Sequence, residues 1–464
     1  MLFNSWIFFL FLPLVFAGFF SLPHKWRWLF ALIASYVFYG WWKWEFLILI
    51  AFSTVFDYFT ALRIEASDKP SVRKRWLSLS LTVNLGILFF FKYFYFFVGS
   101  TEPVQALAHD HESIKDFINF LGRSLPVGIS FYTFQTLSYT LDVYYKRASA
   151  EKHLGQFALF VSYFPQLVAG PIERFTHLND QLKQKQSILY SNLQAGFRLM
   201  LYGFFVKMVI ADNLSYTVSS VFDQPDKWVW YWNLIGVLAF AFQIYADFFG
   251  YSLIAQGVAK LFGINLMDNF NRPYLALGIN DFWQRWHISL STWFRDYVYI
   301  PLGGNRVGQA KWIANILAVF LLSGLWHGAN YTFVIWGALH AVYYLIERFS
   351  PLKIGNTFLK TLITFLAVTF AWIFFRANDL TQASHVMSAM LGFGDGEKLL
   401  DTQAYIFLLL LIFGVLELLR KNQRFDVYCE SFTAFKRWTL YCFLIFCILA
   451  LSGSEYQAFI YFKF

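Results

Sequence analysis

The sequence predicts an all-α membrane protein that crosses the bilayer many times. Of its 464 residues, 58% are hydrophobic and 14% are charged, against roughly 45–50% and about 25% in a typical soluble domain. Apolar stretches that approach the about 20 residues needed to span a bilayer also recur from end to end. No linker, low-complexity tract or repeat interrupts them. We therefore expect a single integral membrane domain over residues 1–464, with its core motifs in residues 125–346.

Thirteen apolar stretches carry this prediction, and some are short enough to be re-entrant. They lie at 4–20, 28–42, 46–62, 76–98, 125–145, 155–170, 193–210, 229–246, 312–325, 330–346, 357–375, 403–419 and 438–452. We expect roughly eleven to thirteen membrane helices, with further interfacial or re-entrant helices. The first stretch lacks a basic leading region and a small-residue cleavage site, so it is expected to stay as a permanent helix.

The charges of the loops predict the orientation of the chain. The loop 63–75 has a net charge of +3, whereas the loop 101–124, one helix later, has a net charge of −2. Because basic loops remain on the cytoplasmic side, the first loop is expected inside and the second outside. The same rule places the basic segment 420–437 inside. Lys25 and Arg27 then also lie inside, and the N-terminus lies outside.

Several functional classes lack their usual sequence features. The net charge of +9 is spread over loops, so no nucleic-acid partner is expected. Cys429, Cys442 and Cys447 have no CxxC spacing, so neither a disulfide framework nor a zinc site is expected. The letters "AHDHE" at 108–112 fit a solvated acidic loop better than a metal site. The chain also has no P-loop, dinucleotide-binding, HExxH or GxSxG motif.

The stretch 265–311 is too polar to span a bilayer and too aromatic for a solvated loop. Five basic and three acidic residues alternate there with tryptophan, tyrosine and phenylalanine. The mixture predicts amphipathic helices at the membrane interface or a buried polar layer. Its arginines, among them Arg272, Arg285 and Arg295, could bind the phosphates of a nucleotide-bearing substrate. For each arginine taken singly, anchoring at the cytoplasmic interface is the simpler interpretation.

One histidine, His327, lies in the apolar run "LLSGLWHGANYTF" at 321–333. Ionisable groups inside membrane segments are costly and are usually functional. A neutral imidazole there could act as a general base, or it could simply form a hydrogen bond with a neighbouring helix; the residues leave both open. The small neighbours Ser323, Gly324, Gly328 and Ala329 would allow either close helix packing or substrate access.

Two further histidines and two carboxylates are weaker candidates. His287, in "FWQRWHISLS", could position a substrate, although the residues alone favour an interfacial histidine with one edge in water. His340 could face the same cavity as His327. Asp142 and Asp247 lie in apolar surroundings and are expected to be ion-pair partners of arginines rather than catalytic groups.

The residues alone therefore leave two classes of protein open: a membrane enzyme and a small-molecule transporter. An intramembrane carboxylate at Asp247 and the imidazole of His327 fit either class. The paired repeats and interrupted helices typical of transporters are not found in the sequence. The polar and aromatic stretch 265–311 favours an enzyme that binds a donor.

Four long segments, in this order, resemble the membrane-bound O-acyltransferase family, and within it the bacterial branch of alginate O-acetylation. They are "LPVGISFYTFQTLSYTLDVYY", "FPQLVAGPIERF", "DNFNRPYLALGINDFWQRWHISLSTWFRDYVYIPLGGNR" and "LLSGLWHGANYTFVIWGALH". The resemblance covers residues 2–380 and, more loosely, the remainder with its aromatic end "FIYFKF". It implies a helix bundle around a central funnel that opens to the cytoplasm. The family's catalytic histidine falls on His327, and its second histidine falls on His287.

The resemblance also implies a reaction. An enzyme of the bacterial inner membrane, with a periplasmic N-terminus, would take acetyl from a cytoplasmic donor, acetyl-CoA, without a permanently bound cofactor. It would pass the acetyl group across the lipid bilayer to a periplasmic SGNH-type acetyltransferase and the polysaccharide machinery, for an acceptor such as alginate. Peptidoglycan O-acetylation, or D-alanyl transfer from a carrier protein to teichoic acid, remains open. The residues expected at the donor are Arg272, Arg285, Trp286, Arg295 and Asn330, with Asn330 and Trp326 as candidates for stabilising the oxyanion.

Overall fold

The computed structural model describes residues 1–94, 96, 126, 128–167, 170–350, 354–392, 396–397, 405–453 and 457–462. Within these ranges the regular structure is helical, and no β-strand is formed beyond one isolated bridge. The loop 101–124 and its "AHDHE" motif lie outside the described residues. The chain divides into two compact units. The first comprises Met1–Leu193 and Val258–Met267, and the second comprises Gln194–Gly257 and Asp268–Phe464.

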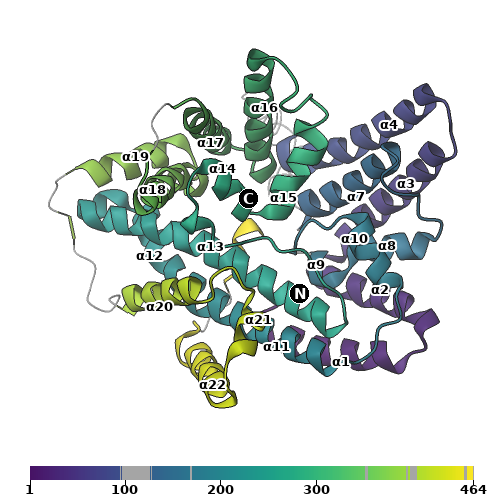
Figure 1. The fold of residues 1–464 in the computed structure, drawn as a ribbon, viewed down its shortest axis with the longest axis horizontal. Helices are drawn as coiled ribbons and strands as arrows, with labels where there is room; N and C mark the ends of the chain where they lie inside the picture. The colour runs from purple at the N-terminus through teal and green to yellow at the C-terminus, as the bar shows by residue number, and fades with distance from the viewer. Residues whose placement is uncertain are drawn as a thin grey trace, which may run out of the picture. The chain divides into compact units, whose positions relative to one another are not determined.

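The first unit is built from packed helices of the N-terminal part of the chain (Figure 1). They are α1 Trp6–Ser21, α2 His24–Gly40, α3 Leu47–Glu65, α4 Pro70–Leu88, α7 Ile129–Tyr144, α8 Leu154–Ser162, α9 Phe164–Leu167 and α10 Phe175–Lys183. Helix α3 packs against α4, α7 and α8, and α2 packs against α1 and α8. The buried Asp57 carboxylate of α3 accepts hydrogen bonds from Ser80 at 2.7 Å and Asn84 at 2.9 Å, both on α4. These bonds satisfy a carboxylate that would otherwise be costly to bury.

The second unit contains the remaining helices. They are α11 Tyr190–Phe204, a π-helix Phe205–Ala211, α12 Asp212–Asp223, α13 Trp230–Leu261, α14 Ile279–Arg285, α15 Ile288–Phe294, α16 Gln309–His327, α17 Tyr331–Phe349, α18 Thr357–Arg376, α19 Leu380–Leu391, α20 Tyr405–Leu419, α21 Phe425–Tyr428 and α22 Ala434–Leu451. Helix α17 packs between α16 and α18 (Figure 1). Helices α11 and α13 each have one end among the residues of the first unit.

Seven helices of the described residues are long and apolar enough to cross a membrane, which makes this a multi-pass membrane protein. They are Trp44–Glu65, Pro70–Tyr93, Tyr190–Asp223, Trp230–Leu261, Gln309–His327, Thr357–Arg376 and Ala434–Leu451. The sequence predicted more spans because it counted every apolar stretch. The stretch 125–145 forms a helix of 16 residues, and 155–170 forms one of 9 residues, both shorter than a full crossing.

The polar stretch 265–311 folds into short pieces rather than one long helix. A 3₁₀ turn, α14, α15 and a π-helix at Arg295–Tyr299 follow one another. Phe282, Trp286 and His287 are fully buried. The sequence allowed either amphipathic helices at the membrane interface or a buried polar layer. The part of the stretch around His287 forms a buried layer.

Candidate functional site

His327 is the last residue of α16, and its side chain is buried. The residue is 2% exposed. Its ring contacts Trp336 of α17, with 5.0 Å between ring centroids, and Phe375 of α18, at 5.1 Å. The preceding Trp326 lies 4.9 Å from it. Three consecutive helices of the second unit therefore fix this imidazole in an aromatic environment.

Glycines allow α16 and α17 to approach closely just before His327. A methyl group placed on Gly324 would lie 2.3 Å from the Phe333 carbonyl oxygen, and one on Gly337 would lie 2.4 Å from the Phe320 carbonyl oxygen. No side chain larger than hydrogen fits at these distances without movement of the backbone. Of the small residues predicted around His327, Gly324 therefore serves close helix packing, one of the two roles that the sequence left open.

His287 is the N-cap residue of α15, just before Ile288, and has an unusual backbone conformation. Its φ of 44° and ψ of 54° lie in the left-handed region, which costs a residue other than glycine energy and is found preferentially at functional sites. The residue is 0% exposed, and its ring lies 4.7 Å from Phe248 of α13. The prediction of an interfacial histidine with an edge in water was therefore wrong. Burial lowers the pKa of His287 to about 3, so the imidazole is neutral.

The two histidines belong to one site, which the C-terminal segment completes. The ring centroids of His287 and His327 are 6.4 Å apart. Tyr461, in a 3₁₀ turn near the end of the chain, lies 5.6 Å from His327 and 6.3 Å from His287. Sequence reasoning missed Tyr461 as a member of the site. The aromatic C-terminus "FIYFKF" was noted, but nothing local in it indicates which residues it contacts.

A buried ion pair anchors this C-terminal segment. Asp247 of α13 accepts a hydrogen bond from the backbone N–H of Ile460 at 2.7 Å, and its other carboxylate oxygen pairs with Lys207. Lys207 also contacts Asp212 at 2.6 Å. The sequence predicted an arginine as the partner of Asp247; the partner is Lys207, which lies in the π-helix Phe205–Ala211 and has a side chain that is 1% exposed. In the first unit, Asp142 does lie near an arginine, Arg147, at 3.9 Å.

The predicted donor residues are not all brought together. Arg285 pairs with Asp281 at 2.7 Å, and Arg295 pairs with Asp296 at 2.8 Å, with the Arg295 side chain 59% exposed. Trp286 is buried and stacks on Phe282. Each of these three contacts is also what a purely structural residue would make. Their role at a donor therefore stays a prediction.

Asn330 and His340 have clear structural surroundings. The Asn330 side chain caps α17 by accepting from Thr332 N–H at 3.1 Å, and it donates to the Asn378 carbonyl. Both the oxygen and the nitrogen of its side-chain amide thus form hydrogen bonds within the protein. His340 is buried against Trp336, at 4.9 Å between ring centroids, and against Trp283, at 5.1 Å. It shares Trp336 with His327.

A polar cavity of about 150 Å³ adjoins the histidine site. Ile288, the neighbour of His287, lines it, and so do Arg420 and Arg424. Arg272 forms a hydrogen bond with Asn422, which also lines the cavity. Among the predicted donor arginines, Arg272 is therefore the one that the structure links to a cavity. Arg420 and Arg424 were missed because the sequence treated segment 420–437 only as a basic loop.

These features define a polytopic membrane protein with two buried histidines in one aromatic site, and with a polar cavity lined by Ile288, Arg420, Arg424 and Asp268. The model of the membrane-bound O-acyltransferase family matches residues 88–378, and this chain belongs to that family. It is an O-acyltransferase of the branch that resembles alginate O-acetylases. Membership of this family excludes the transporter as the class of the protein.

Three relatives show how far the similarity reaches. The chain is 37% identical to a protein of Pseudomonas putida named "Probable alginate O-acetylase AlgI", over 100% of both chains. It is 42% identical to the protein of the same name in Pseudomonas aeruginosa, over 85% of this chain and 75% of the relative. It is 37% identical to the "Peptidoglycan O-acetyltransferase" of Helicobacter pylori, over 84% of this chain and 80% of the relative.

Proposed function

We propose that the chain transfers an acetyl group from a cytoplasmic thioester donor, acetyl-CoA, and that His327 is the general base. The observation that supports this proposal most directly is the pair of buried imidazoles, His287 and His327, with ring centroids 6.4 Å apart. An imidazole kept among aromatic rings is held neutral by its apolar surroundings. It can then accept a proton from a hydroxyl as that hydroxyl attacks an acyl group.

The proposed step balances as an acyl transfer. The acceptor hydroxyl loses its proton to His327 while its oxygen bonds to the thioester carbonyl carbon. The tetrahedral intermediate then expels the thiolate of CoA, which takes up the proton from the imidazolium. His287, whose ring centroid is 6.4 Å from that of His327, would orient the acyl group or the hydroxyl. The buried site would also limit competing hydrolysis of the thioester.

The donor would enter through the cavity beside Ile288. Arg420 and Arg424 line that cavity. Arg420 is paired with Glu417 and Arg424 with Asp426, so a phosphate would bind to the guanidinium N–H groups that these pairs leave available. Arg272 would take part through Asn422. The cavity of about 150 Å³ has room for part of a coenzyme, so the nucleotide end would lie outside it.

The acceptor side of the proposal rests on the relatives. The names of two relatives include alginate O-acetylase. By analogy, the acetyl group would cross the bacterial inner membrane and be placed on a polysaccharide such as alginate by a separate periplasmic SGNH-type acetyltransferase. The relative named peptidoglycan O-acetyltransferase supports peptidoglycan as a second candidate acceptor.

The experiment uses the full-length protein and its His327→Ala variant in proteoliposomes. Release of free CoA from acetyl-CoA is measured with and without the periplasmic partner. Release that falls at least a hundredfold in the variant supports both the donor and the base. Equal release by both proteins would refute His327 as the base. No release by a folded wild-type protein, with the partner present, would refute acetyl-CoA as the donor.

A further inference from the structure

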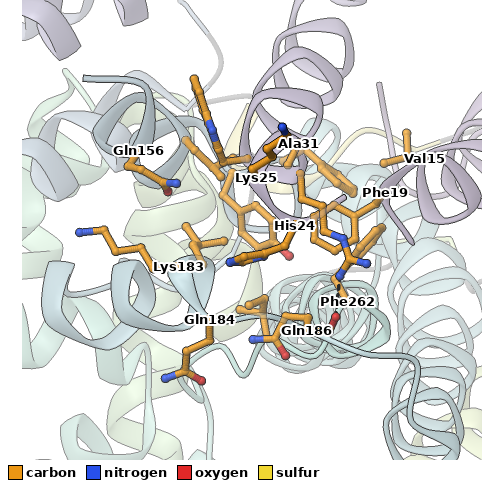
Figure 2. Close-up of a pocket in the computed structure, with 17 residues that line it drawn as sticks. Val15, Phe19, His24, Lys25, Ala31, Gln156, Lys183, Gln184, Gln186 and Phe262 are labelled. Carbon is orange, nitrogen blue, oxygen red and sulfur yellow. Dashed lines mark hydrogen bonds between the residues drawn. The ribbon is translucent and has the colours of Figure 1, made fainter. Parts of the chain in front are cut away.

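A second cavity lies within the first unit, among residues of α1, α2, α8 and α10 and of Val258–Met267 (Figure 2). Its volume is about 140 Å³. All of its lining residues belong to the first unit, so it is not part of the histidine site. Figure 2 shows Lys25 and Lys183 among the polar side chains around it, and Val15, Phe19 and Phe262 among the apolar ones.

The lining combines cationic and apolar side chains, and the Arg27 guanidinium lies 5.3 Å from the Phe19 ring centroid. Lys25, Arg27 and Lys183 contribute positive charge, and no aspartate or glutamate is among the described residues that line the cavity. Val15 and Phe19, both from the apolar helix α1, contribute hydrocarbon and aromatic surface. A ligand that matches both kinds of side chain carries a negative group and an apolar chain.

The three cations are not equally available. Arg27 donates to the Leu22 carbonyl at 3.0 Å and to the Gln186 carbonyl at 2.5 Å, so its guanidinium is part of the wall. Lys183 pairs with the Glu151 carboxylate. Lys25 is exposed, and its ammonium group lies 6.0 Å from the Trp26 ring centroid; none of the ion pairs found among the described residues includes it. Lys25 is therefore the cation that can neutralise a ligand.

Two buried polar atoms at the cavity also lack partners. Tyr163 is 3% exposed, and neither its hydroxyl nor Oε1 of Gln156 has a hydrogen-bond partner among the described residues. Both residues line the cavity. Buried polar groups almost always have a partner, and exceptions point to an unseen ligand or solvent molecule. A ligand here would both accept and donate hydrogen bonds.

The cavity lies beside a segment with the composition of a membrane interface. The turn from α1 to α2 reads "LPHKWRW" at 22–28, and lysine, arginine and tryptophan are the residues that anchor helices at the headgroup level. Trp26 is 50% exposed, and Leu14 on α1 is 73% exposed. An acyl chain could therefore follow α1 while its headgroup stays near Lys25.

We propose that this cavity binds the headgroup of an anionic phospholipid with hydroxyl donors, of the phosphatidylglycerol class. Its phosphate would lie beside Lys25, its headgroup hydroxyls would reach Gln156, and its acyl chains would run along Val15 and Phe19. Free phosphate shares the charge but leaves the apolar side chains of the lining without a contact.

The test counts bound lipids by native mass spectrometry on the full-length protein after delipidation. Phosphatidylglycerol and phosphatidylcholine are titrated separately, against wild type, Lys25→Gln and Tyr163→Phe. Lys436→Gln serves as the matched control, because Lys436 is also exposed and lies at the start of another apolar helix, α22. We expect wild type to prefer phosphatidylglycerol. We expect Lys25→Gln to weaken its binding about fivefold, the effect of one basic residue at an anionic membrane surface, and the control to leave it unchanged.

Each other outcome would overturn the proposal. Equal binding of the two lipids would show that charge is not recognised. A Lys25→Gln variant that binds like wild type would show that the cavity is not the binding site. Tyr163→Phe removes the hydroxyl but retains the ring, and wild-type binding by this variant would show the same. Inorganic phosphate that displaces the lipid at equal concentration would identify free phosphate as the ligand. The number of bound lipids is measured without reference to CoA release. The lipid proposal can therefore be supported or refuted independently of the proposed reaction.

Discussion

The second unit buries its polar side chains in two different ways. Glu417 is matched by a buried counter-charge: Arg420 donates to the two carboxylate oxygens at 2.6 and 2.8 Å, and the Tyr245 hydroxyl donates at 2.6 Å. Around His287 and His327, the side chains that enclose the rings are mostly aromatic. A matched ion pair stabilises the fold in one protonation state. An imidazole among aromatic rings can remain neutral and accept a proton when a substrate arrives.

The largest effect that separates the two regions is expected at His327. His327→Ala should lower the initial rate of CoA release by about 10²- to 10⁴-fold, the usual contribution of a general base. His340→Ala is the matched control, because it removes an equally buried imidazole from the neighbouring helix. We expect the control to lose less than tenfold. Comparable losses in both variants would show that imidazole packing, rather than proton transfer, determines the rate.

The second-largest effect is expected at the buried pair Glu417 and Arg420, where a substitution should lower the stability of the protein. Glu417→Gln leaves Arg420, which is 5% exposed, without its counter-charge. Breaking a buried pair on one side typically costs about 3–5 kcal/mol. We expect a clear drop in the midpoint of thermal unfolding, and a smaller drop in the double variant Glu417→Gln/Arg420→Met. Loss of CoA release at unchanged stability would instead assign the pair to the reaction.

Features that depend only on local sequence could be predicted. Helix positions follow from local hydropathy, so the stretch 312–325 predicted α16 at Gln309–His327, and 357–375 predicted α18 at Thr357–Arg376. The all-α membrane fold needed nothing more. The two histidines were found because a polar group in an apolar run is visible locally.

Contacts between distant parts of the chain were not predictable in this way. That Tyr461 lies beside both histidines depends on the backbone bond from Ile460 to Asp247, which no local pattern encodes. The burial of His287 depends on packing against Phe248 of another helix. Lys207 lies in an apolar run, and its pairing with Asp247, 40 residues further along the chain, has no local signature.

A smaller effect is expected where the histidine region depends on close packing. Gly324→Ala places a methyl group 2.3 Å from the Phe333 carbonyl oxygen, and overpacking of this kind costs about 1–3 kcal/mol. Gly414→Ala is the matched control, because a methyl group there meets nothing within 4 Å. We expect a lower unfolding midpoint for the first variant, and an equal or slightly higher one for the second, since alanine is the better helix former. Equal midpoints would show that α16 and α17 separate at little cost.

The smallest effect tests a histidine that has a carboxylate partner, His177 of the first unit. Its Nδ1 lies 2.6 Å from the Glu173 carboxylate, and this hydrogen bond raises the pKa of His177 above its ordinary value of 6.5. A raised pKa in the folded state stabilises the protein below the unfolded value and loses that effect as pH rises through the folded value. His177→Gln should therefore lower the unfolding midpoint more at pH 6 than at pH 8.

The size of this effect distinguishes the partnered histidine from the buried pair. The His177 side chain is 42% exposed, so solvent screening keeps its contribution below about 1 kcal/mol. CoA release by His177→Gln should stay within about twofold of wild type, and the exposed His385→Gln should show no such pH-dependent difference. A midpoint difference for His177→Gln that grows from pH 6 to pH 8 would mean that the neutral imidazole is the form that the fold prefers. His177 would then resemble His327 rather than the matched charges around Glu417.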